Sequence, residues 1–270
     1  MDEIARSVFS LSPTAAFFIL LMGTARALGA LFGLWGMYFV LGPAAMLRIV
    51  LAMIISAPMI VAQADGFILL IETTPRYGVM LIPLREFVIG FGLGLLTSLP
   101  FFSVLGAAML IDQYRGDFSP GIQGPEGLQI GSYASLNVVM ILFIFVEAGG
   151  FFVLISVLYS SFGALPPALP GLTLAPDFSD GIGDIVQAVM IGLIIMALPV
   201  MIILFLLEFA INMVARMNEK VKMPTIDFLA KSLSITLLMP LLMFGLIRLM
   251  QAQLDGAPPP LALLLKLLGT

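Results

Sequence analysis

Most of this chain consists of long, almost uninterrupted apolar runs that polar loops separate. About six or seven of them approach or exceed ~20 residues, the length of a helix that crosses the hydrocarbon core of a bilayer. The runs cover residues 13–40, 43–64, 66–83, 87–111, 133–165, 185–207 and 233–254. Because they are continuously apolar rather than alternating, they predict helices instead of a transmembrane barrel. We expect an all-α, polytopic, membrane-associated protein.

Two of these runs do not fit one upright helix. The run 66–83 carries two charged residues, which favours an interfacial or re-entrant piece. The run 133–165 is too long, so it forms either one tilted helix or a hairpin bent near the glycines at 149–150. Many runs also contain proline, and broken helices are tolerated at membrane depth only where protein or water covers the freed backbone. This pattern predicts burial inside an assembly or around a transporter-like cavity.

Three polar loops divide the runs. Residues 212–231 form the one basic loop, so this loop is expected to face the cytoplasm, with the acidic loop 166–184 on the other side. The glycine-rich loop 112–132 is longer than the ~12–15 residues beyond which loops in compact proteins are usually functional or disordered. A mobile lid and an ordinary connection both remain open for it.

Composition narrows the classes of protein further. The chain is 61% hydrophobic and 10% charged, whereas a soluble domain has roughly 25% charged residues. With a net charge of −4 it offers no basic patch for nucleic acid. It has no cysteine and no histidine, which excludes disulfides, thiolate catalysis, histidine general bases and the commonest metal ligands. Rhomboid-type Ser–His proteolysis, H-E-x-x-H zinc chemistry and bis-His haem ligation are therefore excluded.

Five ionisable side chains nevertheless fall inside the apolar runs. An Arg or Asp that faces lipid at the centre of a helix costs about 2.5–3.5 kcal/mol. Such residues would be useless in a simple anchor, and they predict runs that pack mainly against protein. They are Arg26, Arg48, Glu86, Glu147 and Glu208.

The two arginines of this set differ in depth. Arg26 lies far inside its run, so an acidic partner such as Glu147 or Glu208 is a plausible interpretation, with a proton relay as its rival. Arg48 lies near the start of its run, where its side chain can snorkel toward the headgroups.

The segment REFVIGFGLGL combines charge with closely spaced glycines. Glu86, next to Arg85, either begins a helix at the interface, where its carboxylate meets the positive end of the helix dipole, or pairs with another subunit. Gly90, Gly92 and Gly94 do not follow the strand–helix spacing of a dinucleotide site. Gly90 and Gly94 instead form a small-xxx-small face for close helix packing.

Motifs along most of the chain resemble those of one known family, the T component of the type III secretion export apparatus, whose flagellar paralogue is the R component of the flagellar export gate. One stretch departs from the family pattern, because KMPTIDFLAKSLSIT, with Asp227 and Lys231, stands where the family usually has P-Q-L-N-x-F and then P-L-K. The motifs that carry the resemblance are LLMGTARALGALFGL with GPAAMLRIVLAMIISAP, REFVIGFGLGL, GAAMLIDQYRG, SSFGALPPALP and ALPVMIILFLLEFAINMVARMN.

The resemblance implies a subunit of a helical export gate, built of bent helical hairpins as a single domain over residues 1–270. We expect such a subunit to have no enzyme activity, no cofactor and no metal. Its partners would be the R and S components, and the autocleaving U component would wrap the base of the gate. Unfolded secreted proteins would pass through it, and the subunit would sit at the bacterial inner membrane, in contact with lipid, inside the basal body. Whether the system builds a flagellum or injects effectors stays open.

The resemblance also implies roles for particular residues. The segment 113–131 would obstruct the closed pore, and Arg–Glu pairs would fix subunit register. The expected pore-plug residues are Asp112, Arg115, Gly116, Asp117, Pro120 and Gly121. The expected assembly charges are Arg26, Arg48, Glu86, Glu147, Glu208 and Arg216, and the expected packing residues are Gly90, Gly94, Gly106 and Pro199.

Two other classes of function compete with this interpretation. A secondary transporter would place a small-solute site at broken helices and predicts inverted repeats, which the sequence does not display. An intramembrane enzyme that uses Asp or Glu as a base predicts clustered carboxylates, whereas the acidic residues here are dispersed along the chain.

Overall fold

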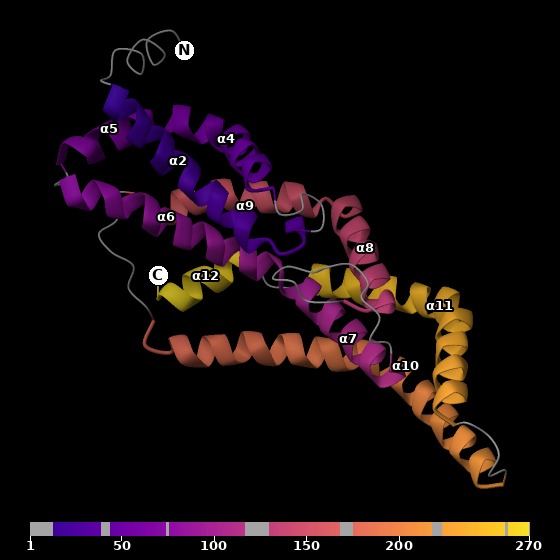
Figure 1. Cartoon of the computed structure of the whole chain (residues 1–270). Helices are drawn as coiled ribbons and strands as arrows, with labels where there is room; N and C mark the ends of the chain where they lie inside the picture. The colour runs from indigo at the N-terminus through magenta and orange to yellow at the C-terminus, as the bar shows by residue number, and fades with distance from the viewer. Residues whose placement is uncertain are drawn as a thin grey trace. The chain divides into compact units, whose positions relative to one another are not determined.

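Every regular element of the described chain is an α-helix (Figure 1). The structure, a computed structural model, describes residues 13–38, 44–73, 76–116, 130–167, 175–217, 223–256 and 259–269. The all-α prediction is therefore confirmed. The chain divides into two compact units, the first formed by residues 1–98, 149–182 and 258–270 and the second by residues 99–148 and 183–257.

The first unit is organised around helix α2. This helix contacts α4, α5, α6 and α9, and α12 packs on α6 and α9. Figure 1 shows α2 between α4 and α6. The helices of this unit are α2 (Pro13–Gly33), α4 (Ala45–Ala62), α5 (Ala64–Thr73), α6 (Arg76–Thr97), α9 (Gly150–Ala164) and α12 (Pro260–Leu268).

Helices α2 and α6 touch through their backbones. A Cβ atom added at Gly90 of α6 would collide with the carbonyl oxygen of Arg26, and one at Gly94 with that of Ala30. The same holds in the other direction, since a Cβ at Gly29 of α2 would lie 2.8 Å from the backbone nitrogen of Phe91. The glycines of both helices thus form one seam, the packing that small-xxx-small spacing permits.

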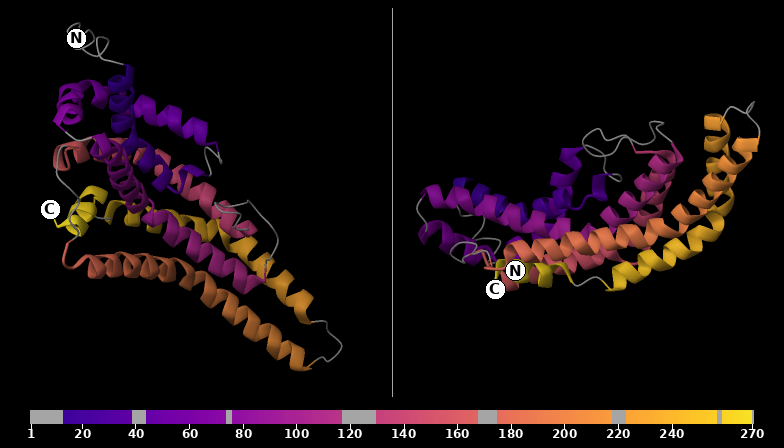
Figure 2. Two further views of the ribbon diagram at one scale, coloured as in Figure 1. Left: turned by 60° about the vertical axis from the view of Figure 1, so that its left-hand side comes forward. Right: turned by 90° about the horizontal axis from the view of Figure 1, so that it is seen from below.

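The second unit contains α7 (Leu99–Arg115), α8 (Ser132–Glu147), most of α10 (Phe178–Met217) and α11 (Met223–Gly256). Helix α7 packs along α8, where the rings of Phe101 and Phe145 meet edge to face with centroids 5.1 Å apart, and α11 contacts both helices. The Ser103 hydroxyl on α7 donates to the carbonyl oxygen of Val189 on α10 at 3.2 Å. Figure 2 shows the end of α10 close to the start of α11.

The length and hydropathy of the helices confirm a polytopic membrane protein. Four helical segments are long and apolar enough to cross a membrane, and α8 with α9 would make a fifth if the bent pair is one span. The four segments are Thr14–Gly33, Ala45–Ala62, Met80–Thr97 and Phe178–Val214.

Two helix breaks fall inside predicted runs. The proline-containing run 87–111 is divided at Ser98 between α6 and α7. The buried Ser98 hydroxyl accepts the backbone N–H of Trp35 at 2.8 Å, and Pro100, which lacks an N–H, follows in the first turn of α7. The run 133–165 breaks at the predicted glycines, because Gly149 adopts a φ of 74°, a backbone conformation that suits glycine.

Several predicted loop boundaries were wrong because helices extend into polar sequence. Residues 212–217 and 223–231 of the expected basic loop are helical, as are residues 178–184 of the acidic one. The run 66–83 is shared between α5 and α6. Charged residues can lie within helices. These polar stretches therefore indicate where the apolar surroundings of the chain end, and they do not mark the ends of helices.

The glycine seam gives a direct test. We expect Gly90→Ala to lower the free energy of unfolding of the detergent-solubilised chain by about 1–3 kcal/mol or more, because the new methyl group meets backbone atoms that cannot move aside. Gly163→Ala on α9 is the matched control, since its Cβ would meet nothing within 4 Å. Equal unfolding free energies for the two variants would contradict a backbone-to-backbone seam.

Candidate functional site

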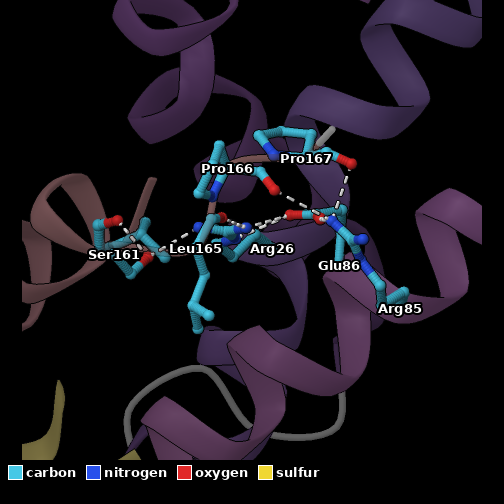
Figure 3. A network of polar contacts seen from close by, with 8 residues as sticks. Arg26, Arg85, Glu86, Ser161, Leu165, Pro166 and Pro167 are labelled. Carbon is cyan, nitrogen blue, oxygen red and sulfur yellow. Dashed lines mark hydrogen bonds and ion pairs between the residues drawn. The ribbon is translucent and has the colours of Figure 1, made fainter. Parts of the chain in front are cut away.

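A fully buried ion pair lies on the seam between α2 and α6 (Figure 3). Arg26 and Glu86 are both 0% exposed, and Nε of Arg26 donates to Oε2 of Glu86 at 2.7 Å. Glu86 lies one helical turn before Gly90, whose missing side chain lets α6 reach the carbonyl oxygen of Arg26. The close approach of the two backbones therefore brings these two side chains together.

The guanidinium of Arg26 also holds the end of α9. Its Nη1 donates to the Ser161 hydroxyl at 3.1 Å, and its Nη2 donates to the carbonyl oxygen of Leu165 at 2.7 Å. The Phe162 ring lies under the guanidinium, with its centroid 4.0 Å from Cζ. Leu165 is the C-cap residue of α9, so Arg26 satisfies a carbonyl that has no partner inside the helix.

Arg85 extends this network toward the segment that follows α9. Its Nη2 lies 2.9 Å from Oε1 of Glu86 and donates to the carbonyl oxygen of Pro167 at 2.8 Å. Each carboxylate oxygen of Glu86 thus meets a different arginine, as Figure 3 shows. We call Arg26, Arg85, Glu86, Ser161 and residues 165–167 the charge network. It joins α2, α6 and α9 within the first unit.

The charge network corrects two interpretations of the sequence. The partner of Arg26 is Glu86, and neither Glu147 nor Glu208 occupies that position. Glu86 is held inside its own chain, which argues against its role as an ion-pair partner for another subunit. Glu147 is exposed in the last turn of α8, and Arg216 is exposed in the last turn of α10.

Arg48 is buried by aromatic rings instead of snorkelling. It is 8% exposed on α4, and its Cζ lies 5.0 Å from the ring centroid of Phe32 and 5.8 Å from that of Tyr38. Both distances allow a cation–π contact. The first unit therefore covers Arg26, Arg48 and Glu86 with its own side chains, without help from a second subunit.

A second cluster of charged and polar groups ties the end of α7 to the start of α8. Oδ2 of Asp112 accepts the backbone N–H of Ala134 at 2.8 Å, and Oδ1 lies 2.9 Å from Nη2 of Arg115. The same Nη2 donates to the Ser132 hydroxyl at 2.7 Å. A Cβ added at Gly131 would collide with the Asp112 carboxylate. We call Asp112, Arg115, Gly131, Ser132 and Ala134 the clasp.

Two of the predicted pore-plug residues, Asp112 and Arg115, belong to the clasp. Asp112 and Arg115 lie in α7, where both are buried, and Gly116 follows with a φ of 80°. Asp117, Pro120 and Gly121 lie outside the described residues. Of the predicted segment 113–131, residues 113–115 belong to a helix.

A third cluster joins α7, α10 and α11 in the second unit. Nζ of the buried Lys231 donates to Oε2 of Glu208 at 3.0 Å and lies 2.8 Å from Oδ2 of Asp227. The ammonium group lies 4.8 Å from the ring centroid of Tyr114. Asp227 and Lys231, the two residues that depart from the family pattern, therefore form one i,i+4 ion pair.

The environment of this cluster keeps its charges fixed. Burial and a hydrogen bond with Glu208 raise the pKa of Tyr114 to about 12. Burial by itself would lower the pKa of Lys231, but the hydrogen bonds with Asp227 and Glu208 outweigh it and raise that pKa. Tyr114 therefore stays protonated and Lys231 stays charged at neutral pH. Protonation states that do not change favour a structural contact between helices over a proton relay.

A cavity of about 320 Å³ lies next to this cluster, between α7 and α10. Its wall is apolar apart from the ring of Tyr114 at one end. Near it, a Cβ at Gly106 would crowd the side chain of Leu193, so this glycine allows α7 and α10 to approach. Pro199 lies inside α10 and is exposed. The cavity is lined by Leu110, Tyr114, Ile194, Ala197, Leu198, Met201, Ile202 and Phe205.

A comparison with known protein families identifies the family of this chain. Residues 10–257 match the family described as bacterial export proteins, family 1. The chain belongs to this family. A comparison with curated individual proteins found no match.

Membership of this family gives the general role of the protein. It is a component of a bacterial protein export apparatus, and its apolar helices indicate a membrane location. The family is a structural one and is not known for catalysis.

Sequence reasoning missed several residues that complete these sites in the export protein. Gly29 and Gly33 have the same spacing as Gly90 and Gly94, and this match was a usable signal for pairing the two helices. The i,i+4 spacing of Asp227 and Lys231 was a second signal. Nothing local marked Ser161 as a partner of Arg26, because the two residues are 135 positions apart.

The Arg26–Glu86 pair can be tested by a double-mutant cycle. We expect Arg26→Ala to cost about 3–5 kcal/mol of unfolding free energy, because it leaves a buried carboxylate without its main partner. The variant with Arg26→Ala and Glu86→Ala should lose less than the sum of the single changes. Denaturant unfolding of the purified chain provides the measurement, and strictly additive losses would show that the two side chains do not interact.

Proposed function

We propose that this export protein is the T component of the export gate in a type III secretion apparatus, at the bacterial inner membrane within the basal body. The single observation that carries the proposal is the family match over residues 10–257. The motifs that resemble those of the T component lie within this range. Its function is steric and structural: its helices form part of the wall of a channel through which unfolded proteins leave the cytoplasm.

The distribution of charge and apolar surface supports this role. Within the first unit the deepest charges satisfy one another, so they need no second chain. Large apolar side chains remain exposed on α4 and α10, including Met46 at 79% and Phe205 at 60% exposure. Exposed apolar faces of this extent indicate contact with lipid or with other proteins. We propose that the R and S components cover part of these faces and that the U component binds at the base.

The obstructing part of the subunit is proposed to be the segment between α7 and α8. The clasp joins α7 and α8 on either side of this segment. Closure would be steric, because a polypeptide segment in the lumen blocks solutes and substrates alike.

The secondary-transporter alternative gains no support from these findings. The family is an export family, and the cavity between α7 and α10 has an apolar wall that offers little to bind a polar solute.

Assembly provides the test of the proposed function. We expect the tagged chain, extracted in mild detergent, to co-purify with the two smaller apolar subunits encoded by neighbouring genes. Arg26→Ala should abolish that complex on a native gel, because the charge network sets the shape of the first unit. Arg248→Ala, which removes an exposed arginine of α11 outside the expected assembly charges, is the control that should leave the yield unchanged. A chain that purifies alone and stable would refute the proposal.

The obstructing segment can be tested separately. We expect replacement of residues 119–127 by two glycines to let a membrane-impermeant dye enter cells that express the complete complex, because the shortened segment no longer fills the lumen. Such a deletion keeps every clasp residue in place. Dye exclusion equal to that of the parent complex, at equal complex yield, would refute the role of this segment.

A further inference from the structure

We propose that the first unit contains a binding site for the amphipathic helix α12, and that docking of α12 in this site completes the unit before the subunit joins the export apparatus. The site consists of Gly92 on α6, Gly181 near the start of α10, and Ala175, which precedes α10. We call these three residues the α12 seat. They belong to the first unit together with α12. The docking stands on contacts within that unit, and its consequence for assembly rests on the proposed function.

The length and composition of α12 make it dependent on its neighbours. A helix of nine residues is too short to cross a bilayer, and helices shorter than ~12–15 residues are marginal in water by themselves. Leu264 and Leu268, one turn apart, are buried, whereas Ala262 and Lys266 are exposed. This helix therefore has one face that needs a partner, and packing on α6 and α9 provides it.

Gly92 is the glycine of α6 that lies away from the seam with α2. It is two residues from both Gly90 and Gly94, which face α2, and residues two apart point to nearly opposite sides of a helix. A Cβ atom added at Gly92 would lie 2.8 Å from Cδ1 of Leu264, closer than side chains pack. The missing side chain at this position therefore makes room for a buried leucine of α12.

Leu267 connects α12 to the chain around the start of α10. Its carbonyl oxygen, in the last turn of α12, accepts the N–H of Ala175 at 3.1 Å. A carbonyl at a helix end has no partner inside the helix, so this bond satisfies it. A Cβ at Gly181 would lie 2.7 Å from Cδ2 of Leu267. The α12 seat thus combines two glycines that admit leucine side chains with one backbone hydrogen bond that sets the register of the helix.

The order of the chain separates the seat from its ligand. Helix α12 comes after α6, α9 and the start of α10, so the residues of the seat are synthesised before the helix that fills it. The family match ends at residue 257, and the matched part of the chain does not include α12. Until α12 docks, its leucines and the surfaces of α6 and α9 beneath them stay uncovered. Exposed apolar surface of that kind favours aggregation over ordered assembly.

Proteolysis of the full chain in mild detergent tests the docking. Lys266 is exposed on α12, but trypsin cuts after it only when the helix opens locally. We expect Gly92→Val to speed this cut several-fold, because the new side chain occupies the place of Leu264. Gly163→Val on α9 is the matched control and should leave the rate unchanged, since a Cβ there meets nothing within 4 Å. An equal cleavage rate for Gly92→Val and the parent chain would overturn the inference.

A size swap covers the case in which Gly92→Val disturbs α6 without touching α12. Leu264→Ala removes as many carbon atoms as Gly92→Val adds, and cores tolerate substitutions that conserve volume. We expect the double variant to be cleaved after Lys266 more slowly than either single variant. A double variant that is cleaved at least as fast as Gly92→Val shows that the two positions do not meet, and the seat is then refuted.

Binding in trans tests whether the seat exists apart from its helix. Leu264→Asp in the full chain should undock α12 and leave the seat free. We expect this variant to bind a fluorescent peptide of residues 258–270 saturably, and we expect no binding when the variant also carries Gly92→Val. A lack of saturable binding to Leu264→Asp contradicts a separable site.

The yield of the complete complex distinguishes this inference from the proposed function. We expect Leu264→Asp to lower the yield on a native gel several-fold, and the size swap to restore part of what Gly92→Val loses. If the parent chain itself forms no complex, the proposed function fails while the proteolysis and peptide results stand. If the parent assembles and Leu264→Asp assembles equally well, docking of α12 is not required for assembly and that part of the inference is refuted.

Discussion

The guanidinium of Arg26 must be neutralised without water, and the first unit is arranged around that requirement. Glu86 can meet it only if α2 and α6 approach until their backbones touch, which requires glycine at positions such as Gly90. The remaining donors of Arg26 then need acceptors, which Ser161 and the end of α9 provide. Because an unpaired buried charge is far more costly than a paired one, packing and polar satisfaction depend on each other here.

The buried charged groups of the second unit are likewise paired within that unit. The carboxylate of Asp112 engages both α7 and α8, and Lys231 is shared by two carboxylates on α10 and α11. Both clusters fix which helices are neighbours more than they add stability, the best-attested role of buried polar groups. Once these buried charges are satisfied inside each unit, many large apolar side chains remain exposed for contact with other molecules.

Sequence patterns predicted helix type and approximate position well, but boundaries less well. The break at Ser98 lies two residues before Pro100, one of the prolines that interrupt the apolar runs, and the Ser98 hydroxyl accepts the backbone N–H of Trp35, which follows α2. The break at Gly149 was predicted because glycine there is a local signal. Residues 212–231 look like a loop by polarity, yet Lys231 is buried in α11 since its charge has found partners.

The sequence by itself determined the class of the protein: its apolar runs, scarce charges and lack of histidine and cysteine leave an all-helical membrane protein without the usual catalytic groups. Its ordered motifs determined the family. Only the tertiary structure decided which charge meets which, because the partner of Arg26 is 60 residues away and that of Asp112 lies across a loop. Helical periodicity specifies the face on which a residue lies, but the neighbour opposite that face is chosen by the packing of the whole unit.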